Sequence, residues 1–286
     1  MDQPRHHLLA DFLRTRRARL SPADLGLPSF GHRRTPGLRR EEVAQLAGVG
    51  VTWYTWLEQG RAIGVSDQVI ASIARVLQLG PHETSYLFTL LHGQRPASRT
   101  DDEPLTPSLI ALLEHQGLFP AFYLGYRWDI LAWNKSAMLL LGDLGALPLG
   151  ERNHVWQMFM NPATRACLVD WEAHAQRMIA EYRLTYGQYL DSEPFTALVD
   201  RLRRHSPEFS AWWPRHDVVG RLNIRKEFEH PVAGRLVFDQ TTMLVSETQG
   251  LKLVVKVPAA GTDTARKLQE LSAAPAETCL VAPILA

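Results

Sequence analysis

Apolar residues recur every three or four positions through the first 92 residues, which predicts a bundle of five short helices. We expect the first helix over about residues 7–20, with its apolar side chains inward and its arginines outward. A loop rich in Pro and Gly, 21–37, separates it from two helices within 38–60. Ser66 can cap a fourth helix, and residues 83–91 form a fifth. The inward positions of the first and fourth helices are Leu9, Phe12, Leu13, Val69, Ile70, Ile73, Ala74 and Leu77.

The segment 38–60 has the spacing of two helices joined by a tight turn. Gly48 stands where the chain must reverse within about three residues, and such a turn often needs a positive φ, which glycine adopts at little cost. Held at a fixed angle by the first helix, the second can enter the major groove of DNA. An ordinary helical hairpin is the alternative. The inner faces of the pair are formed by Leu38, Val43, Ala44, Leu46, Ala47, Val49, Tyr54 and Leu57.

The pattern changes after a polar, Pro-containing stretch at 93–107, which we interpret as an interdomain linker. We therefore expect a multidomain chain: an all-α helix-turn-helix domain at 1–92, the linker, and an α+β domain at 108–275. The second domain begins with strands, continues with helices and ends with two or three strands, which is the order of a PAS-like domain with an antiparallel sheet. Its predicted strands are 121–125, 128–134, 219–229, 234–244 and 251–258, and its predicted helices are 108–114, 135–142, 153–159, 162–186, 195–205 and 264–272.

Short motifs carry a resemblance to a known family. The amino-terminal motifs are Leu-Arg-Thr-Arg-Arg at 13–17, Gly-Leu-Arg-Arg-Glu-Glu-Val-Ala at 37–44 and Trp-Tyr-Thr-Trp-Leu-Glu-Gln-Gly-Arg at 53–61. The carboxy-terminal motifs are Asp-Ile-Leu-Ala-Trp-Asn at 129–134, Asp-Trp-Glu at 170–172, Ser-Pro-Glu-Phe at 206–209, Trp213, and Arg-His-Asp-Val at 215–218. In order and spacing they resemble the lambda-repressor-like helix-turn-helix proteins of the XRE group and, more closely, the MmyB-like transcriptional regulators. The resemblance covers nearly the whole chain.

The resemblance implies a lambda-repressor-like DNA-binding domain followed by a PAS-like sensor of a small apolar ligand, for which a fatty-acyl compound is one candidate. It also implies that Arg17 matches an arginine of the first helix that meets the glutamate ending the recognition helix, here Glu58. We expect this pair to lie within hydrogen-bonding distance and to be partly buried. Gly50 stands where many relatives of the fold have a serine cap.

Positive charge is concentrated beside the predicted helix-turn-helix. Eight arginines and one acid lie between residues 14 and 40, in a chain whose net charge is +1. This is the electrostatic pattern of phosphate binding, and a solvated Arg-rich surface is the alternative. The outer face of the second helix lacks the usual base-reading side chains before Gln59. The candidate DNA-binding residues are Arg33, Arg34, Arg40, Thr52, Trp53, Thr55 and Trp56.

The second domain contains six of the eight tryptophans, a modest aromatic enrichment. Trp133, Phe159 and Met178, together with Met158 and Phe238, are candidates to line an apolar cavity, and plain core packing is the alternative for each. A carboxylate head on the ligand would need a polar partner. The candidates for that role are Arg127, Asn134, His216 and Arg225.

Motifs of catalysis and metal binding are missing from the sequence. No Gly-x-Ser-x-Gly, phosphate loop or His-Glu-x-x-His occurs, and the adjacent residues Arg215-His216-Asp217 point in different directions and rarely form a proton relay. We expect no catalytic residue, no metal, and no cofactor other than a bound fatty acid or similar apolar ligand.

Cys167 and Cys279 lie in unrelated contexts, and neither a signal peptide nor a run of about 18 apolar residues occurs. We expect a cytoplasmic protein that does not act at a membrane.

These patterns favour a sequence-specific DNA-binding transcriptional regulator whose second domain senses a small apolar ligand. In the alternative, the second domain is a protein-interaction module without a ligand, and an enzyme fused to a DNA-binding domain is a weaker third hypothesis. The expected partners are double-stranded DNA, the small ligand and a second copy of the chain. A homodimer is expected because a pseudo-palindromic operator presents two half-sites.

The arginines of the 21–37 loop can be tested directly. The double substitution Arg33→Ala with Arg34→Ala should weaken DNA binding almost equally on all sequences, because bonds to phosphate carry no sequence information. The slope of log affinity against log salt concentration should fall by about two, since each arginine neutralises one phosphate. Affinities measured at several salt concentrations give this slope, and an unchanged slope would remove the loop from the interface.

Overall fold

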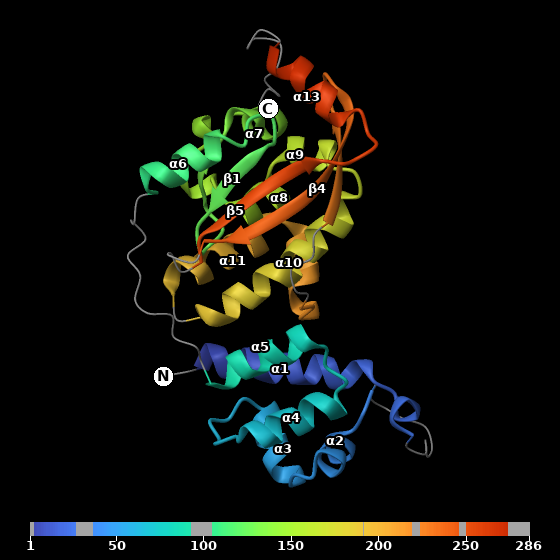
Figure 1. Ribbon diagram of the computed structural model, residues 1–286. Coiled ribbons are helices and arrows are strands. Elements are labelled where there is room, and N and C mark those ends of the chain that lie inside the picture. The colour runs from blue at the N-terminus through green and yellow to red at the C-terminus, as the bar shows by residue number, and fades with distance from the viewer. Residues whose placement is uncertain are drawn as a thin grey trace. The chain divides into compact units, whose positions relative to one another are not determined.

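A computed structural model describes residues 3–26, 37–92, 105–190, 192–218, 224–245 and 250–273 of the chain (Figure 1). The chain packs into two compact units. Unit 1 consists of Met1–Arg99, Ala180–Val199 and Ala211–Gly220, and unit 2 consists of Thr100–Ile179, Asp200–Ser210 and Arg221–Ala286. Two segments beyond residue 107 therefore belong to the same unit as the amino-terminal helices. Arg33, Arg34 and most of the predicted linker lie outside the described residues.

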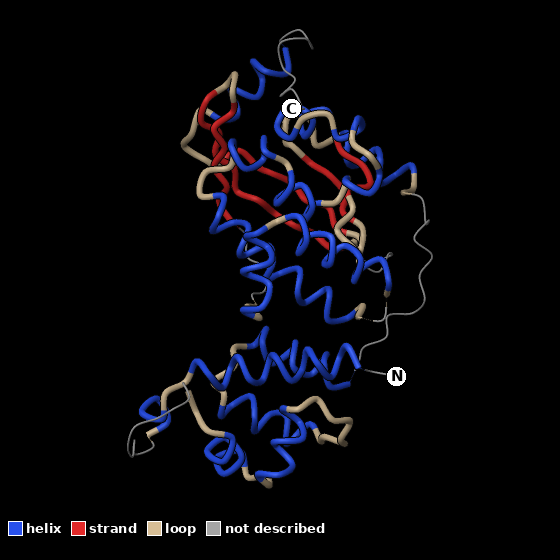
Figure 2. The backbone as a smooth tube through the Cα atoms, turned by 180° about the vertical axis from the view of Figure 1, so that it is seen from behind, coloured by secondary structure: helices blue, strands red, loops and turns tan. Residues whose placement is uncertain are grey.

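The helices and strands follow the predicted order closely (Figure 2). The amino-terminal helices are α1 (Gln3–Arg19), α2 (Arg40–Ala47), α3 (Val51–Glu58), α4 (Asp67–Val76) and α5 (Pro81–His92). The later helices are α6 (Pro107–Glu114), α7 (Lys135–Leu141), α8 (His154–Met160), α9 (Pro162–Cys167), α10 (Trp171–Gln188), α11 (Glu193–His205), α12 (Pro207–Trp212) and α13 (Thr264–Ala273). The strands are β1 (Ala121–Leu124), β2 (Ile130–Trp133), β3 (Ile224–His230), β4 (Gly234–Leu244) and β5 (Lys252–Pro258). Short 3-10 turns are η1 (Pro22–Leu25), η2 (Leu144–Ala146), η3 (Leu149–Glu151) and η4 (Trp213–Arg215).

Local signals in the sequence set the ends of the amino-terminal helices. Gly48 follows α2 with φ of 70°, so the predicted left-handed turn between α2 and α3 is confirmed. Ser66 caps α4, its hydroxyl accepting a hydrogen bond from the Val69 amide at 3.4 Å. Gly50 precedes α3 without a side-chain cap, as expected. The apolar positions that the sequence placed on the inward faces are mostly buried, with Leu46, Val49 and Val69 only partly so.

The predicted pair between Arg17 and Glu58 is confirmed. Arg17 Nε lies 2.7 Å from Glu58 Oε2, and Arg17 Nη2 lies 2.8 Å from Oε1, so the contact is bidentate. Arg40 Nε donates to the same carboxylate at 2.9 Å. The carboxylate itself is fully buried. One acid at the end of α3 thus holds both α1 and the start of α2.

Gly37 lets the chain return to α1 after the Pro- and Gly-rich loop. It has φ of 82°, and a Cβ placed there would lie 2.5 Å from the backbone of Arg17 and Ala18. Only glycine tolerates both the conformation and the approach. The next amide, of Leu38, donates to the Arg17 carbonyl at 3.1 Å. The entry to α2 is therefore fixed against the last turn of α1.

The prediction that the arginines of the first helix all point outward is wrong for Arg16 and Arg17. Arg16 is 3% exposed and lies 3.0 Å from the carboxylate of Glu83 on α5. Its guanidinium also lies 5.0 Å from the ring of Phe12, and burial lowers its pKa to about 10. Arg16 points inward because it contacts the Glu83 carboxylate and the Phe12 ring there. The basic surface of α1 is correspondingly smaller than the sequence suggested.

Unit 1 also contains a buried arginine from the end of α10. Arg183 donates to the carbonyl oxygens of Trp213 and Asp217, the second at 3.3 Å, and its guanidinium lies 4.1 Å from the Trp213 ring. Gly187, one turn later, lies against Tyr86 of α5, where a Cβ would come within 2.5 Å of the tyrosine ring. Asp217 in turn accepts from Arg19 Nη2 at 2.5 Å. The amino-terminal helices and the segment around residue 215 are thus packed as one unit.

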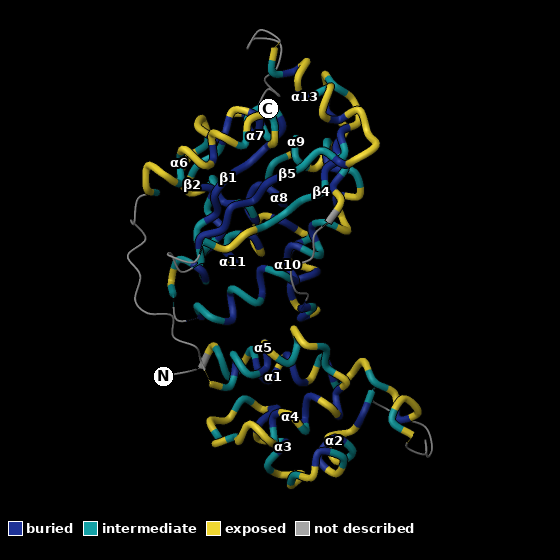
Figure 3. Tube along the Cα trace, in the orientation of Figure 1, coloured by how far each residue is buried: buried dark blue, intermediate teal, exposed yellow. Residues whose placement is uncertain are grey.

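Unit 2 is built on a five-stranded sheet in the order β2-β1-β5-β4-β3, with every neighbouring pair antiparallel. Successive side chains of a strand point to opposite faces, so the sheet has two distinct surfaces. Tyr123 and Leu253 pack with Leu113 of α6 on one face. Phe122 and Val254 pack with residues of α7 and of the turn that follows it on the other. Figure 3 shows β1 and β5 as the most buried part of the sheet.

The predicted continuous helix over 162–186 is wrong, because the chain breaks between α9 and α10. Leu168 forms an isolated bridge with Phe228 of β3, and the Val169 amide donates to the Glu227 carbonyl at 2.9 Å. Asp170 then has φ of 52° before α10 begins. Pairing with the edge of the sheet therefore replaces one helical turn. The sequence pattern also did not predict the short helix α12.

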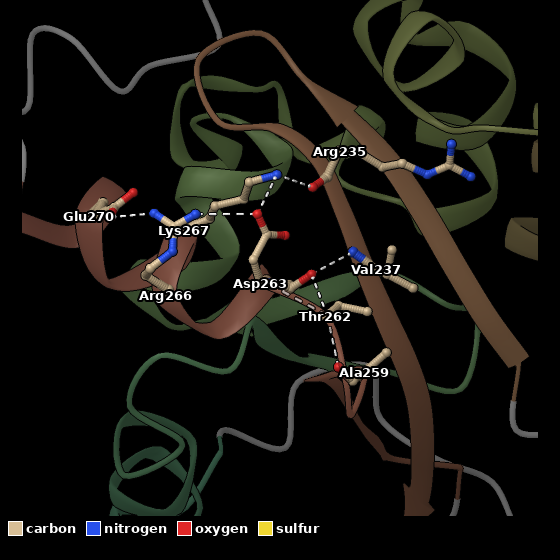
Figure 4. A network of polar contacts seen from close by, with 9 residues as sticks. Arg235, Val237, Ala259, Thr262, Asp263, Arg266, Lys267 and Glu270 are labelled. Atoms are coloured by element: carbon tan, nitrogen blue, oxygen red, sulfur yellow. Dashed lines mark hydrogen bonds and ion pairs between the residues drawn. The ribbon is translucent and has the colours of Figure 1, made fainter.

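The start of α13 is anchored on β4 by a polar network (Figure 4). The Val237 amide donates to Thr264 Oγ1 at 2.9 Å, and Lys267 Nζ donates to the Arg235 carbonyl at the same distance. Asp263 lies 3.2 Å from Lys267 Nζ. These side chains thus satisfy the Val237 amide and the Arg235 carbonyl, two backbone groups of β4 that lie before its pairing with β5.

The Glu58 carboxylate should carry much of the stability of the helix-turn-helix. The substitution Glu58→Gln leaves Arg17 without its ionic partner and should lower the free energy of unfolding by about 3 kcal/mol. Its arginine partners hold the pKa of Glu58 below the ordinary 4.5, so this contribution is present above that pH and is lost as pH falls through the lowered value. Hydrogen exchange of α1 and α3 amides, at pH 7 and near pH 4, measures both effects.

Glu41 provides the control, because it is exposed on the same helix pair. The substitution Glu41→Gln should alter stability by less than about 0.5 kcal/mol. Equal effects of the two substitutions would show that the buried carboxylate has no special role.

Candidate functional site

The outer face of α3 presents the side chains that the sequence singled out. Thr52 and Trp56 are exposed, with Trp56 at 39%, while Trp53 and Thr55 are partly exposed. Residues 52, 55 and 56 share one face because helical positions three and four apart are neighbours. The opposite face carries the buried residues Tyr54 and Leu57. The helix therefore has one face for the domain core and one that a partner can reach.

Two arginines flank this surface in different ways. Arg61 lies with its guanidinium 5.5 Å from the Trp56 ring, a cation–π contact that orients the indole. Arg40 is exposed, but its Nε donates a hydrogen bond to Glu58 at 2.9 Å. Its position is thus set by the same acid that positions α3. Both groups therefore place positive charge near the carboxy-terminal end of α3.

A second candidate site lies on the face of the unit 2 sheet that carries Phe122 and Val254. Lys252, Val254 and Lys256 alternate along β5 and so share this face, and Gln240 lies directly opposite Lys256 on β4. Lys256 Nζ donates to Gln240 Oε1 at 2.8 Å. We call this surface, formed by the sheet residues that share the face of Phe122, the inner sheet face. It is aromatic in part and cationic in part.

Lysines of the inner sheet face lie beside aromatic rings. Lys252 Nζ is 4.4 Å from the centroid of the Trp128 ring. Lys256 Nζ is 5.8 Å from the Phe122 ring and 5.4 Å from the Phe228 ring. Aromatic faces attract ammonium groups, more strongly when water is excluded. The rings therefore offset part of the desolvation cost of these ammonium groups but do not neutralise their charge.

Two histidines adjoin this cluster from the helices. The His154 ring on α8 lies 5.3 Å from Phe122, and burial together with three nearby lysines lowers its pKa well below 6.5. Burial and two lysines lower the pKa of His174, on α10, to about 4. Lys256 itself has a pKa well below 10.5, because of burial and then of Lys226. All three shifts have the direction expected inside a cationic environment.

Among the predicted ligand residues, Trp133 lies on the inner sheet face. It pairs with Phe122 across β1 and β2, and its ring lies 5.8 Å from the guanidinium of Arg152. Asn134 is buried as a structural cap, accepting from the amides of Ala121 and Ala137 at 3.0 and 2.9 Å. Its side-chain amide donates to the Phe119 carbonyl at 2.8 Å. Asn134 therefore has its polar groups engaged by the backbone.

The other predicted ligand residues are dispersed. Arg127 pairs with Asp129 in the turn between β1 and β2, and Arg225 pairs with Asp239 on the opposite, solvent-facing side of the sheet. Phe159 packs against the rings of Trp171 and Phe209 within the helical layer. Met178 is buried in α10. His216 belongs to unit 1, where Arg16 donates to its carbonyl, and burial and arginines lower its pKa to about 3.

Comparison with known families decides what these two units are. Residues 105–271 match the model of the MmyB-like transcription regulator ligand binding domain, and residues 8–87 match that of a helix-turn-helix domain. The chain belongs to the MmyB-like transcription regulators. The first match covers more than half of the chain, and the second covers the helices that position α3. Comparison with curated proteins gave no match.

Both families are of the transcription-regulator type and not enzymes. This MmyB-like regulator therefore has a DNA-binding helix-turn-helix and a ligand-binding domain. Within the part of the chain that the structure describes, no cluster of His, Cys, Asp and Glu has the makings of a metal site. Across those same residues, no helix has the length and apolar character needed to span a bilayer.

The sequence analysis did not select the lysines of the inner sheet face as site residues, although the alternating pattern of β5 places two of them on one face. The segment 251–257 has the sequence Leu-Lys-Leu-Val-Val-Lys-Val, and a period of two places Lys252 and Lys256 on one side. Charged positions in such a pattern are ordinarily assigned to solvent. Here the β5 strand is central and covered on both faces, so its charges lie inside.

Trp56 is expected to read sequence and not merely to add affinity. The substitution Trp56→Ala should lower affinity for the operator about tenfold, because it removes an apolar side chain from a base edge, and leave affinity for unrelated DNA nearly unchanged. The operator is obtained by selection from a random DNA library with the wild-type protein. The salt slope serves as an internal control and should stay constant, since no charge is removed. A parallel fall in affinity on all sequences would assign Trp56 to the domain core.

Proposed function

We propose that this MmyB-like regulator reads a specific operator through α3 and senses a small, largely apolar molecule on the inner sheet face of unit 2. The observation that carries the proposal is the character of that face. It joins aromatic side chains to buried polar ones at the centre of a sheet, where a purely structural core would be apolar.

Support for sequence reading comes from the exposed side chains of α3. Thr52 and Thr55 can exchange hydrogen bonds with a base or a phosphate, and Trp56 can contact a thymine methyl. None of these side chains is charged, so they add discrimination without adding nonspecific attraction. The nonspecific part of the affinity then falls to arginines near the helix-turn-helix.

Support for an apolar ligand comes from the rings on the inner sheet face. Phe122, Phe228 and Phe238 all lie on this side, and Phe228 meets Phe238 edge to face at 5.9 Å. Aromatic walls with a few polar groups are the usual lining of a small-molecule site. A fatty-acyl chain is one ligand that suits such a surface.

A regulator of this layout acts as a homodimer in our proposal. Operators for helix-turn-helix proteins commonly present two half-sites one helical turn apart, and a single α3 reads only one of them. A ligand can then alter regulation only if it binds two arrangements of the dimer with different affinities.

Native mass spectrometry of the full chain tests the proposal in one measurement. The protein is purified from its expression host and analysed alone and with its selected operator, before and after mild lipid extraction. We expect two chains on each operator, and a small extractable mass on each chain before extraction. An empty domain that retains a protein partner would instead support the interaction-module hypothesis. One chain on each operator would contradict the dimer.

A further inference from the structure

Part of the sequence that matches the ligand-binding domain is packed with the DNA-binding helices. The match covers residues 105–271, yet Ala180–Val199 and Ala211–Gly220 belong to unit 1 together with α1 to α5. Arginines make the polar contacts that hold these segments in place. We call the region of these contacts the α1 junction, and its members are Arg16 and Arg19 of α1, Arg183 of α10, and residues 213–217.

Two arginines of the last turn of α1 reach the residues 215–217. Arg16 donates to the His216 carbonyl. Arg19 Nη2 donates to the Arg215 carbonyl at 2.9 Å and to Asp217 Oδ1 at 2.5 Å. Helical positions three apart share one side of the helix, so both arginines face this segment together. The end of α1 is therefore held by three successive residues.

Arg183 holds the same segment from α10. It is fully buried, and it donates to the carbonyl oxygens of Trp213 and Asp217. Its Nη1 also lies 3.4 Å from His216 Nδ1. His216 has φ of 53°, a left-handed conformation that residues with a side chain rarely adopt. Such a conformation persists only where the surrounding contacts hold it, so both helices fix this turn.

Aromatic contacts support the arginines of the junction. The ring of Tyr86, on α5, meets Phe12 of α1 edge to face at 5.3 Å, and Gly187 of α10 lies against the same tyrosine. Tyr186 meets Trp213 edge to face at 5.2 Å. The end of α10 is thus packed against both the 213–217 turn and the helices α1 and α5.

The last turn of α1 also carries the arginine that holds the recognition helix. Arg17 lies between Arg16 and Arg19 in the sequence and makes the bidentate contact with Glu58 at the end of α3. Adjacent helical positions point about 100° apart, so Arg17 faces α3 while its neighbours face the 213–217 turn. A displacement of this turn of α1 would therefore change the direction of the exposed face of α3.

α10 supplies residues to both units. Its residues 171–179 belong to unit 2, and its residues 180–188 belong to unit 1. Within unit 2, Trp171 Nε1 donates to the Met158 carbonyl of α8 at 2.8 Å, which fixes the start of the helix in that unit. Arg183 lies about three turns further along the same helix.

We propose that the α1 junction is the route by which unit 2 changes DNA reading by α3. A ligand that shifts α10 within unit 2 also moves Arg183, and with it the turn at 213–217. The end of α1 follows through Arg16 and Arg19, and α3 follows through Glu58. This inference rests on the proposed sensing function and adds the path of the signal, which does not pass through the interdomain linker.

Coupling between two binding sites is reciprocal, so operator binding at α3 must act back on α10. Hydrogen exchange of the full chain is measured by mass spectrometry with and without the selected operator. Operator binding should slow exchange in α3, in residues 213–217 and along α10. Unchanged exchange in residues 213–217 and α10 would overturn the inference.

The substitution Asp217→Ala weakens the junction without removing a positive charge from α1. It should lower the ratio of operator affinity to unrelated-DNA affinity about fivefold or more, a size typical of coupling between sites. It should also abolish the effect of the operator on exchange in α10. Its melting temperature should stay close to that of the wild type, because a half-exposed ion pair contributes little to stability.

Asp11→Ala is the matched control. Asp11 also pairs with an arginine of α1, and its side chain is 52% exposed against 45% for Asp217. Both substitutions remove one negative charge, so neither should weaken binding to unrelated DNA. Only Asp217→Ala should lower the ratio. An equal fall in the control would reduce the effect to surface charge and would contradict the junction.

Arg183→Lys tests the junction from α10, because it keeps the charge and removes the planar fork that holds two carbonyl groups. It should lower the same ratio, and if this variant does not fold, Asp217→Ala alone decides. A ratio unchanged from the wild type in the folded variants would overturn the junction and leave operator reading and ligand sensing intact. A wild-type chain that selects no operator would overturn the proposed function and this inference with it.

Discussion

The DNA-binding helices depend on one buried carboxylate. Glu58 is the last residue of α3, yet it receives hydrogen bonds from Arg17 on α1 and Arg40 at the start of α2. Helix packing by apolar side chains alone permits small rotations, whereas a bidentate ion pair fixes direction. The exposed face of α3 is therefore aimed by a contact on its buried side. Gly37 contributes to the same end by bringing the chain back against the last turn of α1.

Unit 2 also buries charged side chains, in this case on one face of its sheet. The β1 and β5 strands at the centre of its sheet are covered on both faces, so the alternation along β5 sorts side chains between two interiors and not between interior and solvent. One interior is apolar. The other also holds Lys252 and Lys256, whose ammonium groups lie beside aromatic rings. Glu58 in unit 1 accepts hydrogen bonds from two arginines, whereas Lys256 donates to the neutral amide of Gln240.

Much of the fold could be predicted because it depends on local patterns. Helical periodicity indicated α1 to α5, Gly48 indicated the turn, and alternation indicated the strands to within a few residues. The failures involve partners distant in sequence. Arg16 points inward because of Glu83 and a carbonyl 200 residues away, and the break between α9 and α10 exists because Leu168 meets Phe228. The ligand candidates were chosen by residue type alone, which gives no information about which face of a strand, or which unit, a side chain occupies.

The buried Lys256 also makes folding a proton-releasing reaction. Lys256 binds a proton readily when the chain is unfolded and exposed to water, but its pKa in the folded protein is well below the ordinary 10.5. The unfolded state therefore holds more protons, and the stability of unit 2 rises with pH between these two values. His154 and His174, whose pKa values are also lowered, act in the same direction below 6.5. Alkali should therefore stabilise this domain, because it removes from Lys256 a positive charge that folding otherwise has to bury.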